Sequence, residues 1–319
     1  MSAAGHIPVM VREVVAALAP RDGAIIVDGT FGRGGYAEAL LTAASCRVWA
    51  IDRDPEAVAH GREIARRHDG RLTVIHGRFG RMDRLINAAG LDTVDGVTLD
   101  LGVSSPQIDD AARGFSFRQD GPLDMRMERD GPSAADVVNA AGEAELADII
   151  FHLGEERLAR RIARAIVKRR AEQPIARTGE LAEAVRSVVP RAADGIDPAT
   201  RTFQALRLYV NDELGELDHG LSAAEAILAP GGRLAVVSFH SLEDRRVKAF
   251  LRRRSGSGPR PSRHLPDEVA GPAPSFRLIE RQAVRPSPTE TTNNPRARSA
   301  RLRWAERTSA APWPFEAAA

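Results

Sequence analysis

The chain has 319 residues, of which 43% are hydrophobic, and a formal net charge of only +2 at neutral pH. This length and composition suffice for a full hydrophobic core, with room for a second, smaller domain. The single cysteine, Cys46, excludes an internal disulfide framework and favours a reducing compartment. We expect a cytoplasmic protein with no membrane partner, because the chain has neither a membrane-spanning apolar run nor a signal-peptide layout.

The first predicted strand, residues 24–31, leads into a glycine-rich loop. The strand carries Asp28, and glycines follow at Gly32, Gly34 and Gly35. Glycine permits a sharp turn and lets a ligand approach the backbone. Since the segment after the loop favours a helix, the loop lies where open α/β sheets bind nucleotides. An ordinary structural turn is the alternative interpretation.

The second predicted strand, residues 47–52, ends in Asp52. An acid at this position can accept hydrogen bonds from ribose hydroxyls, and its distance from the first strand is close to the usual separation of roughly 20 residues. Asp54, followed by Pro55, is the better N-cap for the helix predicted at 55–67. Asp52 is therefore available for a ligand.

The order of residues in the loop favours one nucleotide over another. A dinucleotide fingerprint places its glycines directly after the strand, so that a pyrophosphate meets the amino end of a helix. Here Asp28 precedes the glycines, and a carboxylate repels a pyrophosphate. It suits a ligand that carries an ammonium and a sulfonium group. The loop therefore favours S-adenosylmethionine over NAD.

The later segments extend the sheet and interrupt it once. Five further strands are predicted, at 72–76, 94–101, 231–240, 276–281 and 300–306. Helical patterns without strands fill the interval after the fourth strand, at 143–153, 155–172, 179–189 and 198–214. Alternating strands and helices predict a parallel, doubly wound α/β sheet. We therefore expect an all-helical domain at 108–214 inserted between two parts of a sheet domain, 1–107 and 215–319.

Basic residues recur at helical spacing within the predicted insertion. These residues are Arg157, Arg161, Arg164 and Lys168. Such a stripe is often only a solvated helix face, and RNA binding is the alternative. Two later segments are also notable: 251–275 has the composition of a mobile loop, and 286–298 is long for a hairpin loop and is a candidate functional segment.

Several sequence blocks resemble the RsmH (MraW) family of bacterial ribosomal RNA methyltransferases. They are Asp28-Gly-Thr-Phe-Gly-Arg-Gly-Gly35, Ala50-Ile-Asp-Arg-Asp-Pro55, Leu99-Asp-Leu-Gly-Val-Ser-Ser-Pro-Gln107, Gly114-Phe-Ser-Phe117, Gly121-Pro-Leu-Asp-Met-Arg126, Ala199-Thr-Arg-Thr-Phe-Gln-Ala205, Ser238-Phe-His-Ser-Leu-Glu-Asp244 and Asn294-Pro-Arg-Ala-Arg-Ser299. The resemblance covers residues 6–306. It implies a class I methyltransferase (Rossmann-like) sheet with a final antiparallel pair of strands and an inserted helical domain. It also implies methylation of the exocyclic N4 amine of a cytosine in 16S rRNA of the small ribosomal subunit, with S-adenosylmethionine as cofactor.

The resemblance places the cofactor contacts at positions that match the family blocks. These are Gly34, Gly35, Tyr36, Asp52, Phe79, Asp100 and Gln107, to which the loop argument adds Asp28 and Gly32. Tyr36 departs from the family, whose members often have histidine there. For Phe79 there are two interpretations: it stacks on the adenine of the cofactor, or it is an ordinary aromatic residue of the core. His240, beyond the fifth sheet strand, is a candidate RNA contact. No metal site is expected, because histidines and cysteines do not cluster.

The chemistry suggests which residues act on the acceptor amine. The N4 lone pair of cytosine is delocalised into the ring, so hydrogen-bond acceptors on the amine would make it a better nucleophile. Asp100 is the first candidate for this role, with Ser104 and Ser105 next. For Phe115 and Phe117 there are also two interpretations: one of them stacks on the target base, or both pack at the domain junction. The alternative functions are a DNA amino-methyltransferase and a non-enzymatic ribosome-assembly factor; a homodimer is left open.

Overall fold

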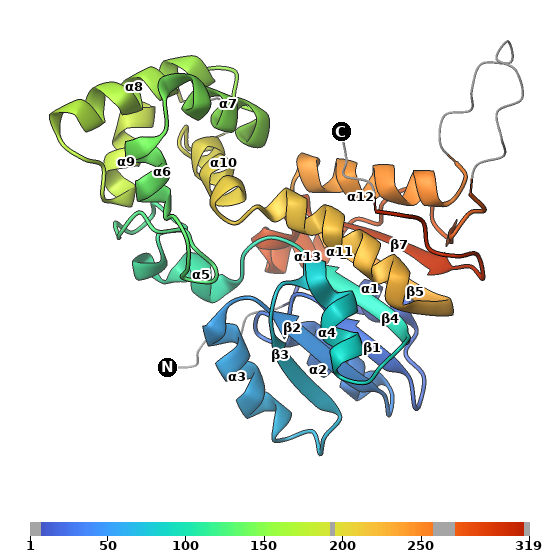
Figure 1. Cartoon of the computed structure of the whole chain (residues 1–319). Helices are drawn as coiled ribbons and strands as arrows, with labels where there is room; N and C mark the ends of the chain where they lie inside the picture. Colours follow the sequence, from blue (N-terminus) through green and yellow to red (C-terminus); the bar gives the residue numbers. More distant parts are fainter. Residues whose placement is uncertain (1–7, 192–194, 258–271, 316–319) are drawn as a thin grey trace, which may run out of the picture. The chain divides into compact units, whose positions relative to one another are not determined.

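Figure 1 shows the computed structural model of the chain, which describes residues 8–191, 195–257 and 272–315. The chain divides into two compact units. The first consists of Met1–Gly102 and Leu214–Ala319, and the second of Val103–Glu213. The sequence predicted a helical insertion at residues 108–214. The second unit begins slightly earlier, at Val103, and ends at Glu213.

One seven-stranded sheet forms the centre of the first unit. Its strands are β1 (Ile25–Asp28), β2 (Arg47–Asp52), β3 (Leu72–His76), β4 (Val94–Asp100), β5 (Leu228–Ser238), β6 (Phe276–Leu278) and β7 (Arg301–Arg307). They lie in the order β3-β2-β1-β4-β5-β7-β6. The first five strands are parallel, and β7 runs antiparallel to both β5 and β6. The predicted doubly wound sheet with a final antiparallel pair is confirmed.

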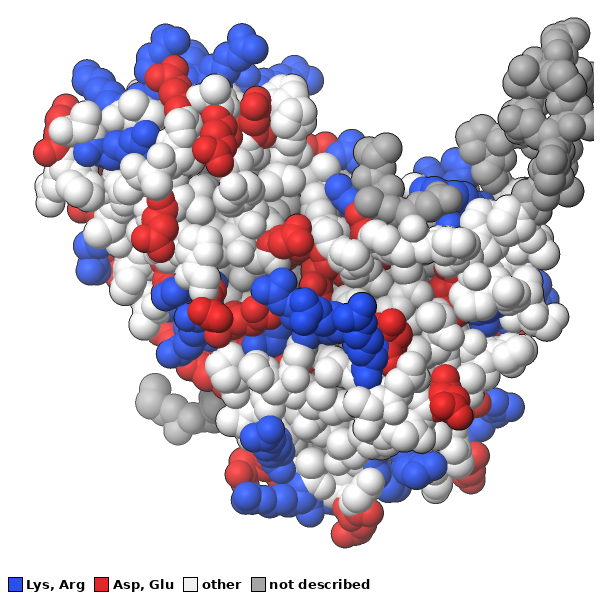
Figure 2. Space-filling view, viewed as in Figure 1, with Lys and Arg blue, Asp and Glu red and all other residues white. Residues whose placement is uncertain are grey.

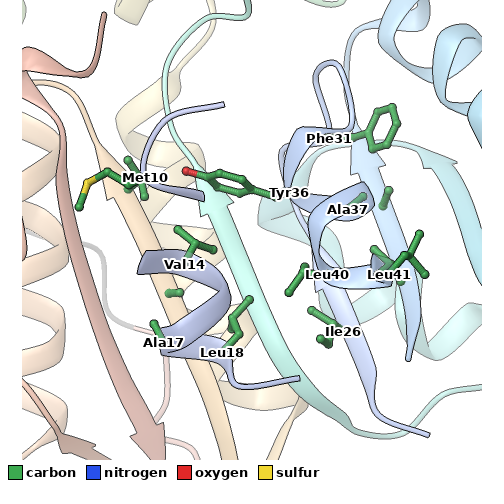
Figure 3. Packing of buried hydrophobic residues seen from close by; sticks show 14 of the residues in the cluster. Met10, Val14, Ala17, Leu18, Ile26, Phe31, Tyr36, Ala37, Leu40 and Leu41 are labelled. Carbon is green, nitrogen blue, oxygen red and sulfur yellow. The ribbon is translucent and has the colours of Figure 1, made fainter. Parts of the chain in front are cut away.

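Helices and short helical turns flank this sheet. They are α1 (Val11–Leu18), α2 (Gly35–Ala43), α3 (Pro55–Ala65), η1 (Phe79–Arg81), α4 (Met82–Ala88), α11 (Glu213–Ile227), α12 (Ser241–Arg254), α13 (Pro288–Asn293) and η3 (Pro295–Ser299). Successive strand residues point to opposite faces, so Ile26 belongs to one buried cluster and Val27 to another. Figure 3 shows the first cluster, in which Val14 and Leu18 of α1 lie beside Leu40 of α2. Burial on both faces explains why these strands are nearly continuous apolar runs.

The second unit is built from helices around its own core. It contains α5 (Ser105–Asp109), η2 (Ala111–Arg113), α6 (Ala134–Ala140), α7 (Glu143–Gly154), α8 (Ala159–Glu172), α9 (Thr178–Arg186) and α10 (Thr200–Val210). Leu146 and Ile150 of α7, Ile162 of α8 and Leu206 of α10 are fully buried in one cluster. Within its described residues the unit has no strand, only an isolated bridge between Pro122 and Arg177.

For two helices in this region, the predicted bounds were wrong. The helix expected from residue 155 begins only at Ala159, because Glu155 is left-handed (φ 51°) and the Glu156 carboxylate accepts a hydrogen bond from Leu158 N. The helix expected at 198–214 is two helices, α10 and α11, separated where Asp212 adopts φ 46°. Left-handed backbone is unfavourable for these residue types and interrupts an α-helix.

We predicted a mobile loop at 251–275, and the predicted start of this loop was wrong. Residues 251–254 form the last turn of α12, and Arg254 is almost fully buried. Its guanidinium forms a 2.8 Å ion pair with the buried Glu225 carboxylate and lies over the Trp313 ring. These contacts stabilise the end of α12. Residues 258–271 of the predicted loop lie outside the described residues.

Candidate functional site

Three acidic side chains lie at the carboxyl edge of the sheet. Asp28 ends β1, Asp52 ends β2 and Asp100 ends β4, and β1 lies between the other two strands. The parallel register sets Asp28 opposite Ala50 of β2 and Thr98 of β4. Carboxyl ends of parallel strands are where open α/β sheets bind ligands. The sheet therefore brings together three of the acids that the sequence selected.

Asp52 is fixed by two backbone donors. Its Oδ2 accepts a 2.7 Å hydrogen bond from Gly32 N, and its Oδ1 accepts one of 2.8 Å from Asp54 N. Burial raises the pKa of Asp52 to about 6. Each carboxylate oxygen can accept a second hydrogen bond, so both remain able to accept from a diol. Asp54 accepts from Glu56 N and caps α3, which confirms that prediction.

Asp28 is a buried acid with an oxygen that has no partner. Its exposed fraction is 1%, and Oδ1 accepts a 3.2 Å hydrogen bond from Thr30 N. Oδ2 is buried without a hydrogen-bond partner among the described residues. Burial, together with the nearby charge of Asp52, raises the pKa of Asp28 to about 7. The backbone amides of Thr30 and Ala37 act on this pKa in the opposite direction. A buried acceptor without a partner is costly, so this oxygen suits a ligand that brings a donor or a positive charge.

Asp100 is the most strongly shifted acid of the three. Burial, followed by the charge of Asp28, raises its pKa to about 8. Its backbone N donates a 2.6 Å hydrogen bond to Thr30 Oγ1, which ties the end of β4 to the loop after β1. The hydroxyl of Tyr36 lies 3.4 Å from Asp100 Oδ1. At neutral pH and without a ligand, the Asp100 carboxyl is therefore mostly in its neutral form, and a nearby positive charge would favour the ionised form.

Tyr36 is a packed residue of the first core. Its exposed fraction is 4%, and its hydroxyl donates a 2.6 Å hydrogen bond to Val9 O. Figure 3 shows the hydroxyl directed from α2 toward the segment before α1. Burial raises the pKa of the phenol well above its usual value. The phenol therefore remains neutral and connects α2 to Val9 and to the acidic edge.

The loop glycines are required by close packing as well as by backbone conformation. Gly32 and Gly34 have positive φ angles of 53° and 82°. A Cβ atom on Gly34 would lie 2.8 Å from the Phe31 ring, and one on Gly35 would lie 2.1 Å from the Cγ of Pro8. The chain's own side chains thus occupy the space beside two of these glycines. Gly32 N points at Asp52, so the loop is fastened to the second strand.

Phe79 and His240 have clear structural tasks. Phe79 is half-buried against Gly29 and Gly220, where a Cβ on Gly220 would lie 2.3 Å from its ring. His240 caps α12, because its Nδ1 accepts from Glu243 N, and its Nε2 lies 3.1 Å from the Glu243 Oε1. The His240 side chain is only 12% exposed. Contacts of Phe79 with the cofactor and of His240 with RNA stay predictions.

Three other predicted site residues belong to the second unit. Ser104, Ser105 and Gln107 lie at the start of α5, and the Gln107 side-chain oxygen accepts a 3.0 Å hydrogen bond from Ser104 N. Ser105 and Gln107 are buried. Phe117, a candidate for base stacking, packs edge-on against Phe203 of α10 at 4.8 Å, while Phe115 packs against the same core. These contacts position α5 and the segment after it within the helical unit.

The basic stripe is exposed. Arg161, Arg164 and Lys168 lie on α8, as predicted. Arg157 was predicted on the same helix but lies in the turn before it. Figure 2 shows Lys and Arg gathered along the edge of the helical unit where Figure 1 places α8. Arg164 lies 3.5 Å from Glu143, and within the described ranges the other three have no carboxylate partner. Three of the four cations thus present unpaired positive charge to solvent.

Sequence reasoning missed three residues that support the acidic edge. Thr30 bonds both Asp28 and Asp100, Glu243 raises the pKa of Asp100, and Glu290 of α13 accepts a 2.6 Å hydrogen bond from Met10 N. Thr30 and Glu243 lie inside the sequence blocks considered above. The signal for Glu290 was the unusual length of segment 286–298.

Neither a metal-binding cluster nor a membrane-spanning helix occurs among the residues that the structure describes. No group of histidine, cysteine, aspartate and glutamate side chains there could hold a metal ion. None of the described helices combines the length and apolar character needed to cross a membrane.

The sheet order, with β7 antiparallel beside β5, and the acids ending β1, β2 and β4 define a class I S-adenosylmethionine-dependent methyltransferase. Within that class, the chain belongs to the MraW methylase family, whose sequence model matches residues 3–308. A protein named ribosomal RNA small subunit methyltransferase H from Rhodospirillum centenum is 68% identical over 96% of this chain and 93% of its own length. The protein of the same name from Paramagnetospirillum magneticum is 62% identical, over 98% and 99%.

Solved structures give more distant matches. The crystal structure of an rRNA methylase from Streptococcus thermophilus is 11% identical, with a TM-score of 0.42 over 96% of this chain and 100% of its own.

The cofactor is S-adenosylmethionine, and the acidic edge fits it. The buried Oδ2 of Asp28 has no hydrogen-bond partner among the described residues, and three carboxyls with raised pKa values lie at one edge. A cationic ligand stabilises their ionised forms. A pyrophosphate would increase the repulsion between negative charges there. The three carboxyl groups therefore match the positively charged ammonium and sulfonium groups of this cofactor.

Proposed function

We propose that this protein methylates the exocyclic N4 amine of a cytosine in 16S rRNA, using S-adenosylmethionine as the methyl donor. The names of its relatives support a small-subunit ribosomal RNA substrate. The observation that carries the choice of an amine acceptor is Asp100, an acid at the end of β4 with a pKa of about 8. The resemblance in the sequence blocks supports cytosine N4.

Asp100 has the properties needed to act on an amine. As a carboxylate it accepts a hydrogen bond from the amine and draws the nitrogen lone pair out of the ring. The amine nitrogen bonds to the methyl carbon as the bond between that carbon and the sulfonium sulfur breaks, and the sulfur keeps the electron pair of the broken bond. The nitrogen then gives up one proton, and the Asp100 carboxylate can take it. A carboxyl with a pKa of about 8 holds such a proton more readily than an ordinary one. Asp100 is therefore our proposed base.

The other two acids hold the cofactor in this proposal. The cofactor supplies an activated methyl group on a sulfonium, so the protein's task is mainly to orient donor and acceptor. Asp52 accepts hydrogen bonds from the ribose hydroxyls with the lone pairs that Gly32 N and Asp54 N leave available. Asp28 provides its buried oxygen to the ammonium group.

RNA is held by the second unit in this proposal. The exposed stripe of Arg157, Arg161, Arg164 and Lys168 binds phosphates, which position the RNA without reading its sequence. Ser104 and Ser105 remain candidates for further acceptors toward the amine. Gln107 stays a predicted cofactor contact.

The test is methyl transfer from labelled S-adenosylmethionine to unmethylated 30S subunits, followed by digestion and nucleoside analysis. We expect N4-methylcytidine as the labelled product. Duplex DNA and naked 16S rRNA serve as parallel substrates. Label in another nucleoside would contradict the N4 assignment, and label only in DNA would favour a DNA amino-methyltransferase. Binding to 30S subunits without any transfer would favour an assembly factor.

A further inference from the structure

A hollow lies on the first unit, in the segment that connects β6 to β7. It has a volume of about 430 Å³. It is lined by Arg285, Pro286, Pro288, Thr291, Thr292 and Arg298. Sites for small ligands have volumes of roughly 300–1,000 Å³. The hollow is therefore large enough for a nucleotide-sized group.

The backbone on both sides of the hollow is fixed. Val284 exchanges two hydrogen bonds with Leu302 of β7, at 2.9 and 3.0 Å, so the residue after it is held beside the sheet. At the other end, Ala297 and Ala300 are buried and anchor η3. Between them, Ser287 caps α13 by accepting a hydrogen bond from Glu290 N. The two arginines of the hollow thus extend from ordered positions.

The lining carries positive charge and no acid. Arg285 and Arg298 are exposed, and neither guanidinium has a carboxylate partner among the residues that the structure describes. By contrast, Arg301 and Arg303 of the adjacent β7 both pair with Asp244, at 2.9 and 2.7 Å. Guanidinium groups match phosphate oxygens in geometry and charge. The hollow is therefore suited to a phosphate.

The two threonine hydroxyls of the hollow donate their hydrogen bonds to backbone oxygens at the start of α13 and not to a ligand. The Thr291 hydroxyl donates to Ser287 O and the Thr292 hydroxyl to Pro288 O, both at 3.0 Å. A hydroxyl has one proton to donate, so neither is available to a phosphate in this arrangement. Among the side chains that line the hollow, Arg285 and Arg298 therefore supply the hydrogens that remain available to a phosphate.

α13 also contacts the residues around the acidic edge. While its Thr291 and Thr292 line the hollow, its Glu290 accepts a 2.6 Å hydrogen bond from Met10 N. Glu290 is close enough to Tyr36 for its charge to raise the pKa of that phenol, and Tyr36 in turn contacts Asp100. One short helix therefore separates the hollow from the surroundings of the proposed base.

We propose that Arg285 and Arg298 bind a phosphodiester of the RNA chain close to the target nucleotide. This inference rests on the proposed function, since it assigns a phosphate subsite to the same substrate. The two exposed guanidiniums suit a phosphodiester in a continuous chain better than free phosphate, which protein sites hold with more numerous, buried donors.

The test compares the double variant Arg285→Gln/Arg298→Gln with wild type in binding to unmethylated 30S subunits over a range of salt concentrations. Each phosphate contact contributes roughly 0.7–0.9 to the slope of log affinity against log salt. We expect the slope to fall by roughly 0.7–0.9, the KM for subunits to rise and S-adenosylmethionine affinity to stay unchanged. The matched control is Arg21→Gln/Arg66→Gln, which removes two exposed arginines of the same unit that are paired with Asp95 and Glu63.

The outcomes separate this inference from the proposed function. An unchanged salt slope and KM in the double variant would overturn the inference, even if wild type forms N4-methylcytidine. So would equal losses in the control variant, which would show an effect of net charge alone. Competition by millimolar inorganic phosphate that the double variant abolishes, with an unchanged subunit slope, would identify a free-phosphate site instead. A reduced slope with a wild-type product other than N4-methylcytidine would support the inference and overturn the function.

Discussion

The Oδ2 of Asp52 accepts a 2.7 Å hydrogen bond from Gly32 N, joining the acid that ends β2 to the glycine loop that follows β1. Asp52 therefore has two tasks: it fixes the loop and, in our proposal, it binds the ribose of the cofactor. The second oxygen fixes Asp54 N in the same way. This relationship makes Asp52 the most direct test of the cofactor site.

We expect Asp52→Ala to weaken S-adenosylmethionine binding at least about tenfold. The estimate follows from a charge-assisted hydrogen bond worth about 1.5–3 kcal/mol, together with release of the loop. Isothermal calorimetry measures the affinity, and circular dichroism checks that the variant is folded. Asp92→Ala, an exposed acid in the same unit, is the control. Equal affinities for wild type and Asp52→Ala would remove Asp52 from the cofactor site.

Asp100→Asn distinguishes a base from a cofactor ligand. If Asp100 acts on the amine, the variant lowers the single-turnover rate by about 100-fold or more while S-adenosylmethionine affinity changes little. If it only holds the cofactor, rate and affinity fall together. Single-turnover methylation and equilibrium binding, measured on the same preparation, separate these outcomes. A variant normal in both would exclude Asp100 from the reaction.

The raised pKa of Asp100 also predicts a pH-dependent stability. The folded carboxyl has a pKa of about 8 against the ordinary aspartate value of 3.8, so it holds its proton more tightly when folded. Folding stability without cofactor should therefore fall as the pH rises from about 4 to about 8. Asp100→Asn cannot ionise, so its stability relative to wild type should rise across this interval, by roughly 5 kcal/mol for a pKa that is raised from 3.8 to about 8.

Urea unfolding at pH 5 and at pH 8.5 measures this difference. We expect the two proteins to be closer in stability at pH 5 than at pH 8.5. A constant difference between the two pH values would show that Asp100 has an ordinary pKa in the folded protein.

The basic stripe on α8 predicts a second salt-dependent contact. Arg161→Glu/Arg164→Glu should weaken 30S binding and flatten its salt dependence, because phosphate contacts release counterions. Cofactor affinity should not change, since the glycine loop belongs to the other unit. Glu143→Gln, which removes the carboxylate beside Arg164, is the matched control and should bind at least as well as wild type. Wild-type affinity and salt slope in the double variant would mean that the stripe is only solvated surface.

Local chemistry in the sequence determined the sheet and its acidic edge. Short apolar runs ended by Asp28, Asp52 and Asp100 identify buried parallel strands, because both faces of such strands are covered. The Asp54–Pro55 pair identified a helix start, and the structure has its N-cap there. These features depend on neighbours within a few residues, which is why they could be read without a structure.

Only the tertiary structure decided how the acids interact and where the helices break. The pKa of Asp100 depends on burial and on Asp28, which is far away in the chain and adjacent only in the folded sheet. The end of α12 could not be read from its basic composition, because it is held by Glu225 of another helix. The hollow at Arg285 and Arg298 likewise exists only because β7 pairs with Val284 and closes the segment between them. Such long-range contacts leave no periodic pattern in the sequence.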